Sequence, residues 1–292
     1  MMTLEEQILK QKLACPTTHL PLVFEAGGKS LITSDGKSKY PLLNGRVPIL
    51  LQKPENAQEY AHSSDRMNKE YDARALRSIS QKVKARLFSD FRSRRSIEAF
   101  SRIFDHQPAG ALCISVGGGP SRQHPILVNL NIAPFPNVDI VADAHFLPYC
   151  NEATKAIFCE AVLEHLADPG SAVQEMNRIL EPGGMVYAVT PFLQAYHGYP
   201  HHYQNFSLQG HCRLFESNGF KILEAGTCVG PAFTMTSLMS TFLYEYVPGG
   251  RWLAKIWSVF ALFLRPIDRF IHLKDNAHIM ASTTYLVAEK KR

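Results

Sequence analysis

Short apolar runs alternate with turns and helical patterns through residues 107–228 of the chain. The runs lie near residues 112–116, 126–132, 138–142, 156–159 and 185–190, with one more at 283–288. Apolar runs of this length, bounded by Gly, Pro and Asn, are typical of strands that are covered on both faces of a parallel sheet. The pattern therefore predicts an α/β fold with a mainly parallel, doubly wound sheet.

Two helices are predicted beside the later strands of this sheet. Ser171 is the expected N-cap of the first helix, whose apolar face runs to Leu180. The sequence Glu-Pro-Gly-Gly at 181–184 cannot continue a helix, so the helix is expected to end there. Ser207 is expected to cap the second helix, which ends at Asn218-Gly219.

The chain divides into three regions that differ in composition and in residue pattern. Residues 1–54 are rich in Pro, Gly and short apolar runs, which predicts a small β-rich accessory domain. Residues 55–106 follow helical spacing and carry a surplus of Lys and Arg, which predicts a basic helical linker or cap. A solvated helix face accounts for that surplus better than a nucleic-acid surface. Residues 107–292 then hold the sheet domain.

An apolar helical insertion is predicted within the sheet domain at residues 229–275. Large apolar residues from Trp252 to Phe270 follow helical spacing, while Arg251 and Lys255 fall on another face. Such a segment either packs on the sheet as a lid or lies at a membrane surface. The second interpretation predicts peripheral membrane contact through residues 251–272.

The composition limits the class of protein and the compartment in which we expect it. The chain has 292 residues, 46% of them hydrophobic and 20% charged, and a net charge of +5, which is ordinary for a globular protein. Its six cysteines show no paired spacing, the N-terminus has no apolar signal segment, and the apolar stretch at 256–264 is too short to span a bilayer. We expect a cytoplasmic protein, with the inner membrane surface as the alternative location; the oligomeric state stays open.

Glycines follow the first predicted strand of the sheet domain. Gly117, Gly118 and Gly119 come directly after the run at 112–116. Glycine lets the backbone approach a ligand closely, because no Cβ stands in the way. A phosphate-binding P-loop is excluded by the missing Gly-Lys-Ser/Thr, and the dinucleotide fingerprint fails because Arg122 stands where glycine is needed.

Polar residues end the second and third predicted strands. Asn131 can hydrogen-bond the hydroxyls of a ribose, and Asp143, next to Ala144, can accept from the exocyclic amine of an adenine. The carboxyl ends of parallel strands meet at one edge of an open α/β sheet, where such folds bind ligands. We expect these residues to converge on one site.

In this order, the motifs resemble those of the class I, "type 11" S-adenosylmethionine-dependent methyltransferases, which have a Rossmann-like fold. The resemblance is carried by the segments at 138–149, 160–166, 178–184 and 191–203. It implies S-adenosylmethionine as the cofactor, with the glycines at the methionine and ribose, and Glu160 near the methionine end. The cofactor-binding residues implied are Gly117, Gly118, Gly119, Asn131, Asp143, Ala144 and Glu160.

The N-terminal region resembles the small zinc-ribbon-derived domain that activates some methyltransferases. The similar segments are 13–22, 40–41 and 44–51. In metallated members paired cysteines hold zinc, whereas here Cys15 is alone and Thr18 stands where its partner would be. The resemblance implies a degenerate activator domain that supports the catalytic domain in cis, and we predict no bound metal.

The loop after the fifth predicted strand supplies the candidates for catalysis. His197, His202 and Tyr203 lie near the expected substrate mouth, where a histidine can orient the acceptor or take its proton. The intervening Gly-Tyr-Pro favours a turn over a helical metal-binding pair. The protein itself would mainly position the substrate against the reactive methyl group. We expect the acceptor to be a small molecule or a glycan or lipid precursor.

Three departures from the family pattern keep a second function open. Ser115 replaces the acidic residue usual before the glycines, and Asn131 replaces a ribose-binding carboxylate. The few residues between Gly119 and the second strand leave no room for the usual first helix. The alternative is a non-catalytic binding or scaffold protein that kept the methyltransferase fold. An oxidoreductase is a more distant third, since the dinucleotide fingerprint fails.

Overall fold

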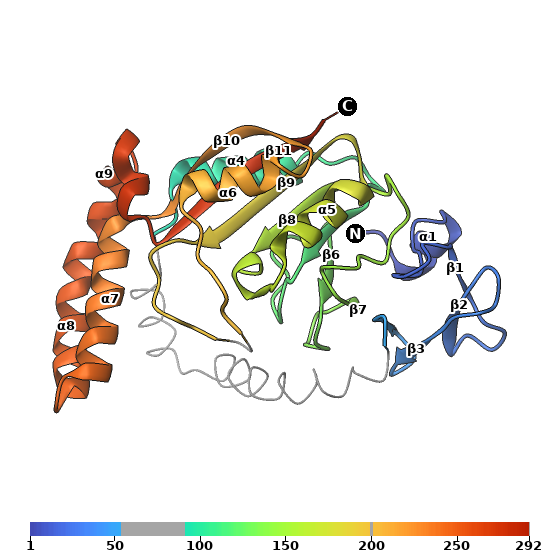
Figure 1. Cartoon of the computed structure of the whole chain (residues 1–292), viewed down its shortest axis with the longest axis horizontal. Coiled ribbons are helices and arrows are strands. Elements are labelled where there is room, and N and C mark those ends of the chain that lie inside the picture. Colours follow the sequence, from blue (N-terminus) through green and yellow to red (C-terminus); the bar gives the residue numbers. More distant parts are fainter. Residues whose placement is uncertain (54–90, 199–200, 292) are drawn as a thin grey trace.

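The structure, a computed structural model, describes residues 1–53, 91–198 and 201–291. The helical spacing expected between residues 55 and 90 therefore lies outside the described residues. Figure 1 shows a long sheet with helices packed on it, the N-terminal strands at one end and a pair of helices at the other.

The described residues form one mixed sheet of eleven strands, in the order β1-β2-β3-β4-β7-β6-β5-β8-β9-β11-β10. The strands are β1 (Leu22–Phe24), β2 (Ser30–Thr33), β3 (Lys39–Leu43), β4 (Val47–Leu50), β5 (Cys113–Val116), β6 (Leu127–Asn131), β7 (Ile140–Ala142), β8 (Thr154–Glu160), β9 (Leu180–Pro191), β10 (Phe220–Val229) and β11 (Thr283–Lys290). All the runs predicted as strands are strands, which confirms the α/β prediction. Strand β10 was not predicted, because its alternation of apolar and polar residues follows directly on a helix.

The central strands from β4 to β9 run parallel to one another, and β11 and β10 add an antiparallel edge. The chain enters this part of the sheet at β5, moves outward to β6 and β7, and then crosses to β8 on the other side of β5. The direction of winding thus reverses between β5 and β8. Ligands of open α/β sheets bind at such a switch point, outside the carboxyl ends of the strands.

Helices cover both faces of the sheet, as the doubly wound prediction requires. Helix α4 (Arg94–Phe104) packs on one face, and α5 (Pro169–Ile179) and α6 (Leu208–Glu216) pack on the other. No helix lies between β5 and β6, so the described connection at residues 117–126 confirms the predicted loss of the first helix.

The helix boundaries correct one prediction and confirm another. Asp168, not Ser171, caps α5, and its carboxylate accepts from the Ser171 amide at 3.1 Å. The earlier start is favoured because Pro169 at the first helical position has no amide hydrogen to leave unsatisfied. Ser207 caps α6 as predicted, with its hydroxyl accepting from the Gly210 amide at 3.2 Å.

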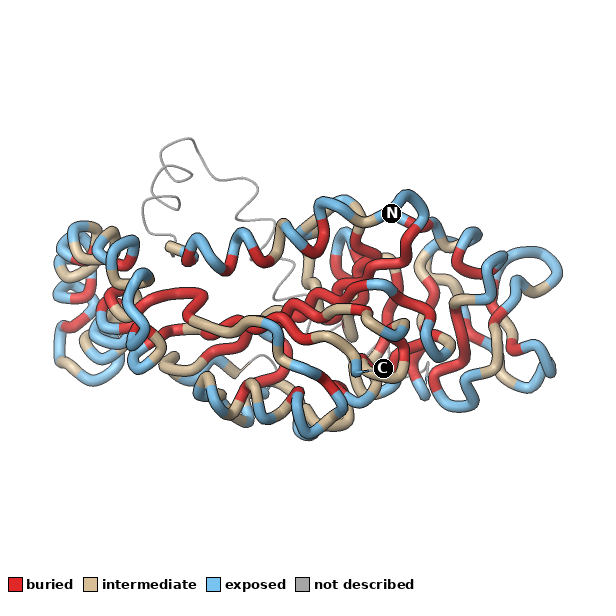
Figure 2. Tube along the Cα trace, turned by 90° about the horizontal axis from the view of Figure 1, so that it is seen from above, coloured by how far each residue is buried: buried red, intermediate tan, exposed pale blue. Residues whose placement is uncertain are grey.

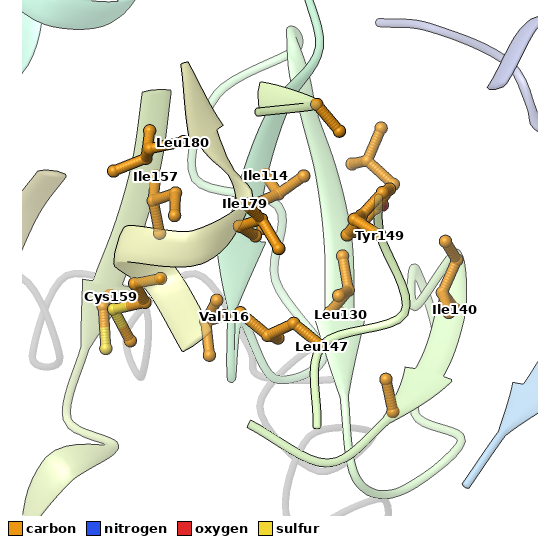
Figure 3. Close-up of a cluster of buried hydrophobic side chains, with 14 of the residues drawn as sticks. Ile114, Val116, Leu130, Ile140, Leu147, Tyr149, Ile157, Cys159, Ile179 and Leu180 are labelled. Carbon is orange, nitrogen blue, oxygen red and sulfur yellow. The ribbon is translucent and has the colours of Figure 1, made fainter. Parts of the chain in front are cut away.

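The larger apolar core lies between the parallel strands and α5 and α6. Figure 3 shows side chains of β5, β6 and β8, among them Ile114, Leu130 and Ile157, packed together with Ile179 and Leu180 beside them. Each is at most 1% exposed, and burying a side chain of this size stabilises a fold by roughly 1.5–3 kcal/mol. This core fixes the strand ends that carry the site.

The N-terminal residues extend the same sheet. Strand β4 pairs in parallel with β7, so β1–β4 add to the edge of the sheet that holds the site. Short helix α1 (Leu4–Leu9) packs beside them, and the buried Tyr149 hydroxyl donates to Gln7 Oε1 at 3.2 Å. The Cys15 thiol contacts the hydroxyl groups of Tyr40 and Thr17 at 3.0 and 3.2 Å. The N-terminal unit thus supports β7 and the segment that follows it.

A helical hairpin follows β10. It consists of α7 (Pro231–Tyr246) and α8 (Gly250–Leu264) and leads through η3 (Arg265–Ile267), α9 (Asp268–Ile271) and η4 (Asp275–Met280) to β11. It stands beside the end of the sheet in Figure 1, and Figure 2 shows that most of its residues are exposed or half-buried. No described helix is long and apolar enough to cross a membrane.

Candidate functional site

A pocket of about 490 Å³ lies at the carboxyl ends of β5, β6, β7 and β8. Gly117, Gly119, Asn131, Asp143 and Ala144 all line it. These residues come from three separate connections, and the sheet brings them together as its strand order predicts. The switch point of the sheet is therefore also the place where a cavity exists.

The glycine turn has both a structural and a ligand-facing part. Gly117 has a φ of +71°, and a Cβ there would lie 2.2 Å from Val162 Cγ2. A Cβ on Gly118 would lie 2.0 Å from Asn129 Oδ1, so this glycine is needed for packing inside the protein. Gly119 has a φ of +60°, and a Cβ on it would meet no atom within 4 Å, so its surface faces open space. Gly119 is thus the glycine best placed to let a ligand approach the backbone.

Asn131 lies at the end of β6 with its side chain in the pocket lining. Its Oδ1 accepts from the Ala133 amide at 3.0 Å, which fixes the side chain in a turn. Its side-chain nitrogen takes part in none of the hydrogen bonds found among the described residues. A fixed amide with a donor left over can serve a ribose hydroxyl without carrying charge.

Asp143 and His145 form a pair at the end of β7. Asp143 Oδ1 accepts from the His145 amide at 2.9 Å and contacts the His145 ring at 2.7 Å. Burial raises the pKa of Asp143, but the hydrogen bonds from His145 outweigh it, and the net pKa is lowered. The hydrogen bond to Asp143 in turn raises the pKa of His145. Asp143 is therefore a carboxylate at neutral pH, with one oxygen engaged and the other available to an amine.

Two of the predicted cofactor residues lie outside the pocket lining. Gly118 faces Asn129 and Ser115 rather than the cavity. The carboxylate of Glu160 is ion-paired with Arg92, which lies two residues before α4. Because side chains alternate along β8, Glu160 points to the face covered by α4, away from Cys159. Among the described residues, Gly118 takes part in packing and Glu160 in an ion pair, and neither lines the pocket.

The predicted catalytic loop lies at the mouth of the pocket. Tyr203 and His201 line the cavity together with His165, whereas His197 and His202 are not part of the lining. The His197 amide donates to His202 Nδ1 at 3.2 Å, and His202 Nε2 contacts Asn205 Oδ1 at 2.6 Å. His202 is therefore occupied in shaping the loop, and the histidines that line the cavity, His165 and His201, are not the two that the sequence suggested for catalysis.

A buried carboxylate stands behind this loop. Glu164, in the short helix η2 (Leu163–His165), is 0% exposed, and its Oε1 lies 3.7 Å from His165 Nε2 and 3.9 Å from His197 Nε2. Its backbone carbonyl accepts from the Tyr203 amide at 2.9 Å, which ties the loop to β8. The nearby Glu164 carboxylate raises the pKa of His197. Sequence reasoning missed Glu164, because an isolated glutamate in a short turn gives no sign of its burial.

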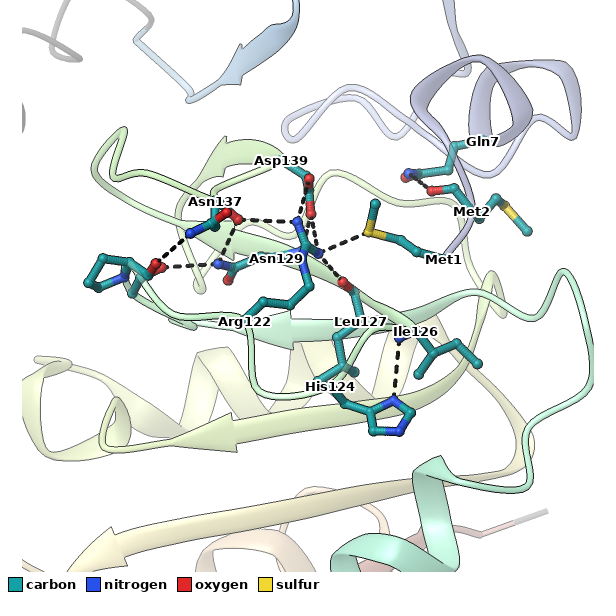
Figure 4. Close-up of polar contacts among 12 residues, drawn as sticks. Met1, Met2, Gln7, Arg122, His124, Ile126, Leu127, Asn129, Asn137 and Asp139 are labelled. Atoms are coloured by element: carbon teal, nitrogen blue, oxygen red, sulfur yellow. Dashed lines mark hydrogen bonds and ion pairs between the residues drawn. The ribbon is translucent and has the colours of Figure 1, made fainter. Parts of the chain in front are cut away.

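A second polar network lies beneath the glycine turn. Unlike Glu164, its carboxylate has hydrogen-bond donors for both oxygens. Figure 4 shows Arg122 forming a two-pronged contact with Asp139, at 2.8 and 2.9 Å, while the Asn129 amide donates to Asp139 at 2.7 Å. The Asn129 side chain donates to the carbonyl oxygens of Gly119 and Asn137. Arg122 thus has a structural role, since it holds the turn that replaces the missing helix onto β6 and the start of β7.

Ala161, directly after β8, has an unusual backbone conformation. Its φ is +53°, a left-handed conformation that residues with a Cβ rarely adopt, and it lines the pocket. Its amide donates to the Val189 carbonyl at 3.0 Å, which holds it there. Strained backbone of this kind collects at functional sites. It directs the chain from β8 toward Glu164 and His165.

A comparison with known protein families finds a match that includes several residues of this site. Residues 125–188 match a family model described as a methyltransferase domain. The match runs from β6 into β9 and includes Asn131, Asp143 and the Glu164–His165 turn. It supports a methyltransferase-type domain in this part of the chain and S-adenosylmethionine as its cofactor. None of the curated proteins matches the chain.

Among solved structures, the chain is similar to several of methyltransferase type. A chain of the complex between the Haloferax volcanii Trm112 methyltransferase activator and a methyltransferase has 14% identity and a TM-score of 0.45, with 77% of this chain and 97% of that one covered. A sarcosine dimethylglycine methyltransferase from Galdieria sulphuraria has 14% identity and a TM-score of 0.43, covering 68% and 83%. The [4+2]-cyclase SpnF has 16% identity and a TM-score of 0.44, covering 68% and 81%. Likenesses this distant identify neither the substrate nor the activity.

Proposed function

We propose that the protein transfers a methyl group from S-adenosylmethionine to an acceptor that enters beside His165, His201 and Tyr203. One observation carries this proposal: most of the residues expected to hold the cofactor line the same cavity as Tyr203, one of the three residues expected to meet the acceptor. Gly119, Asn131, Asp143 and Ala144 come from the strand ends, and Tyr203 from the loop after β9. A methyltransferase needs such a shared cavity, because donor and acceptor react directly.

The polar groups of the cavity suit the cofactor. Asp143 keeps one carboxylate oxygen for the exocyclic amine of adenine, since its other oxygen is engaged by His145. The amide nitrogen of Asn131 can donate to a ribose hydroxyl, and the open surface of Gly119 lets the methionine portion lie against the backbone. The protein supplies position and shelter from water, while the sulfonium methyl group of the cofactor supplies the reactivity.

The mouth of the cavity suits an acceptor that must lose a proton. In the reaction the acceptor atom forms a bond to the methyl carbon, the carbon–sulfur bond breaks, and its electron pair stays on sulfur as S-adenosylhomocysteine. A hydroxyl acceptor needs help with its proton, and of the predicted histidines we assign this role to His197, which lies outside the cavity lining and 3.9 Å from Glu164 Oε1. We assign His202 and Tyr203 to the shape of the loop and the wall of the cavity. The acceptor class remains a small molecule or a glycan or lipid precursor.

Calorimetric titration of the protein with S-adenosylhomocysteine tests the cofactor site. We expect micromolar binding to the wild type and about 10- to 100-fold weaker binding to Asp143→Ala, because a hydrogen bond to a charged group contributes roughly 1.5–3 kcal/mol. Asp275→Ala, which removes an exposed aspartate of η4, is the control and keeps full affinity. Absence of binding to the wild type even at about 1 mM overturns the enzymatic proposal.

A non-catalytic role is the second candidate, and a specific feature favours it. The connection at 117–126 has no helix, so the cofactor lacks one wall and the positive end of a helix dipole. The buried hydroxyl of Ser115 stands where the family has a carboxylate and has no hydrogen-bond partner. A binding or scaffold protein with the same fold would show these features and would fail the titration above.

We also propose that the N-terminal unit supports the catalytic domain from within the same chain, in the cytoplasm. The pairing of β4 with β7 and the contacts of α1 with Tyr149 support this role, because they brace the strand that ends in Asp143. The six cysteines are all unpaired thiols, which favours a reducing compartment. A variant that lacks residues 1–51 should lose affinity for S-adenosylhomocysteine, and unchanged affinity would contradict the supporting role.

A further inference from the structure

Three ligand atoms converge at the mouth of the cavity. Oε1 of Glu164 and the nearest ring nitrogens of His165 and His197 all lie within 4.8 Å of one another. Metal–ligand bonds of about 2.0–2.2 Å require ligand atoms that lie roughly 3–3.5 Å apart. The contacts of 3.7 and 3.9 Å to Glu164 need only a small inward movement to reach that spacing.

The hydrogen bonds of the two rings determine which nitrogens face Glu164. His165 Nδ1 contacts the His201 carbonyl oxygen, and His197 Nδ1 contacts the Ala195 carbonyl oxygen at 3.0 Å. A carbonyl oxygen can only accept, so each ring donates through Nδ1, and a neutral ring keeps its lone pair on Nε2. Both lone pairs are then directed at the same carboxylate. This is the arrangement that fixes metal-binding histidines in place.

Glu164 itself has no donor for the oxygen in question. Oε1 is buried without a hydrogen-bond partner, and the other oxygen has one long contact, to the Thr190 hydroxyl at 3.4 Å. A buried charge is costly unless it is paired or coordinates a metal. The distances from Oε1 to the two rings are too long for hydrogen bonds. With both rings neutral, two lone pairs face a carboxylate oxygen that accepts no hydrogen bond, and a cation between them would satisfy all three groups.

We propose that Glu164, His165 and His197 bind a divalent transition metal at the mouth of the cofactor cavity. Two histidines and a carboxylate suit Zn²⁺ and its chemical neighbours, and three protein ligands leave a position open. His165 lines the cavity, so a metal held by its ring would lie beside the space expected for the acceptor. There it would act as a Lewis acid on a hydroxyl acceptor and lower the pKa of that hydroxyl, whose proton would pass to solvent. This role rests on the proposed function, whereas metal binding itself does not.

The first test is titration of chelator-treated protein with Zn²⁺ and with Co²⁺. We expect one ion per chain, an absorption band of bound Co²⁺ in the visible range, and about 100-fold weaker binding for Glu164→Gln and His197→Ala. His278→Ala is the matched control, because this ring also bonds a backbone carbonyl through Nδ1 but lies in η4, outside the cluster. Wild type that binds neither ion, or Glu164→Gln that binds as tightly as wild type, overturns the proposal.

Titration of the same variants with S-adenosylhomocysteine separates the metal from the cofactor. Cofactor binding without metal binding overturns the metal site alone. Metal binding without cofactor binding overturns the proposed methyl transfer and leaves the metal site standing. Histidines on the surface can hold Zn²⁺ weakly, so binding that the His278→Ala control loses to the same degree as His197→Ala also counts against the proposed site.

A separate observation concerns the hairpin of α7 and α8. Its packing is inverted, in the sense that small residues are buried and large apolar residues are exposed. Its buried positions are small: Ala232, Thr234 and Thr236 in α7, with Ala254 and Ala261 in α8. The seam also holds polar contacts, including Trp257 Nε1 donating to the Thr236 carbonyl at 2.9 Å. Small residues and interhelical hydrogen bonds at the seam are typical of helices that pack in an apolar environment.

The outer surface of the hairpin is correspondingly apolar. The large exposed side chains are Met235, Leu238, Met239, Phe242, Tyr244, Tyr246, Trp252, Leu253, Ile256, Val259, Phe260 and Phe263. Trp252 is 68% exposed and Phe263 is 74% exposed. Many exposed apolar side chains on one hairpin favour a site of contact with a protein or a membrane. Their exposure favours this interpretation over a lid packed on the sheet.

The charges of the hairpin and its base favour an anionic partner. Arg251 and Lys255 are exposed, and Glu245 is the one exposed acidic residue within α7 and α8. A cleft of about 670 Å³ at the base is lined by Arg94, Arg95 and Arg269 among others. Apolar side chains interspersed with cations match an interface in which acyl chains lie beneath anionic headgroups.

We infer that this hairpin inserts its apolar surface into the headgroup region of an anionic bilayer. Sedimentation with vesicles of phosphatidylcholine and phosphatidylglycerol tests the inference, with vesicles of phosphatidylcholine alone for comparison. We expect preferential binding to the anionic vesicles and at least about tenfold less binding for the double variant Trp252→Asp, Phe263→Asp, because each side chain contributes roughly 1.5–3 kcal/mol when buried. Leu9→Asp, at an exposed position of α1, is the control and keeps binding.

The same double variant distinguishes a membrane from self-association. Both positions are exposed, so it should fold and bind S-adenosylhomocysteine as wild type does. Light scattering in the absence of lipid should show wild type and variant at the same mass. A wild-type dimer that the double variant cannot form, together with equal vesicle binding, overturns the inference in favour of contact between two copies of the chain.

Discussion

The Arg122–Asp139 network and the Glu164 cluster each hold a buried or half-buried carboxylate near the pocket, but they treat it in opposite ways. Both oxygens of Asp139 accept from Arg122, and one also accepts from the Asn129 amide. Glu164 is more deeply buried, yet its Oε1 accepts no hydrogen bond and lies 3.7 and 3.9 Å from the ring nitrogens of His165 and His197. A carboxylate with all its donors stabilises a fold, whereas one without donors is retained for what it binds.

The largest effect on stability is expected at Asp139. Asp139→Ala leaves the Arg122 guanidinium and the Asn129 amide without their acceptor, and loss of one partner of such a pair costs about 3 kcal/mol. Urea unfolding followed by circular dichroism measures the change. Arg94→Ala removes the exposed pair between Arg94 and Glu98 and should cost less than about 0.5 kcal/mol. A loss at Asp139 no larger than this control would show that the network contributes little.

Glu164→Gln should change stability in the opposite direction. In chelator-treated protein the substitution removes an unpaired buried charge and supplies an amide that can donate to the lone pair of His165 or His197. We expect the free energy of unfolding to rise by about 1 kcal/mol or to stay unchanged. Asp139→Asn is the matched substitution and should lower it, since Asp139 already has its donors. If both substitutions lower the free energy of unfolding equally, Glu164 is as well satisfied by its surroundings as Asp139, and the proposed difference between the two carboxylates is wrong.

The contrast between the two clusters also shows which features can be predicted from sequence. Periodicity locates the strands, and strand ends locate Asn131 and Asp143, because the side-chain pattern of a parallel sheet depends on local sequence. The start of α5 is misplaced by three residues, since Asp168 and Ser171 are equally good caps when read alone. The N-cap is decided by Pro169, whose position fits the first turn.

The cluster at the mouth could not be predicted in the same way. Glu164 is followed by His165, but His197 comes from a loop more than thirty residues later, and the meeting depends on the path of that loop. The role of Gly118 depends on the side chains that the turn after β5 meets, and the role of Glu160 depends on the face of β8 that it takes and on its partner Arg92. The inverted packing of the hairpin depends on which residues are buried, and apolar composition alone fits a lid equally well.

The smallest effect on the free energy of unfolding is expected at the Asp143–His145 pair. In its hydrogen bonding Asp143 lies between Asp139 and Glu164, because one of its carboxylate oxygens is engaged and the other is available. The pKa of His145 is raised above 6.5, so its contribution is complete below pH 6.5 and is lost as the pH rises through the raised value. The pKa of Asp143 is lowered below 3.8, so its contribution is present above pH 3.8 and is lost as the pH falls through the lowered value. His145→Gln should therefore cost up to about 1 kcal/mol near pH 5.5 and less near pH 8.5, because the pair is partly exposed. Urea unfolding of wild type and variant at both pH values, without cofactor, measures the difference; a cost that grows with pH would mean that neutral His145, rather than its cation, is the form that holds Asp143 in place.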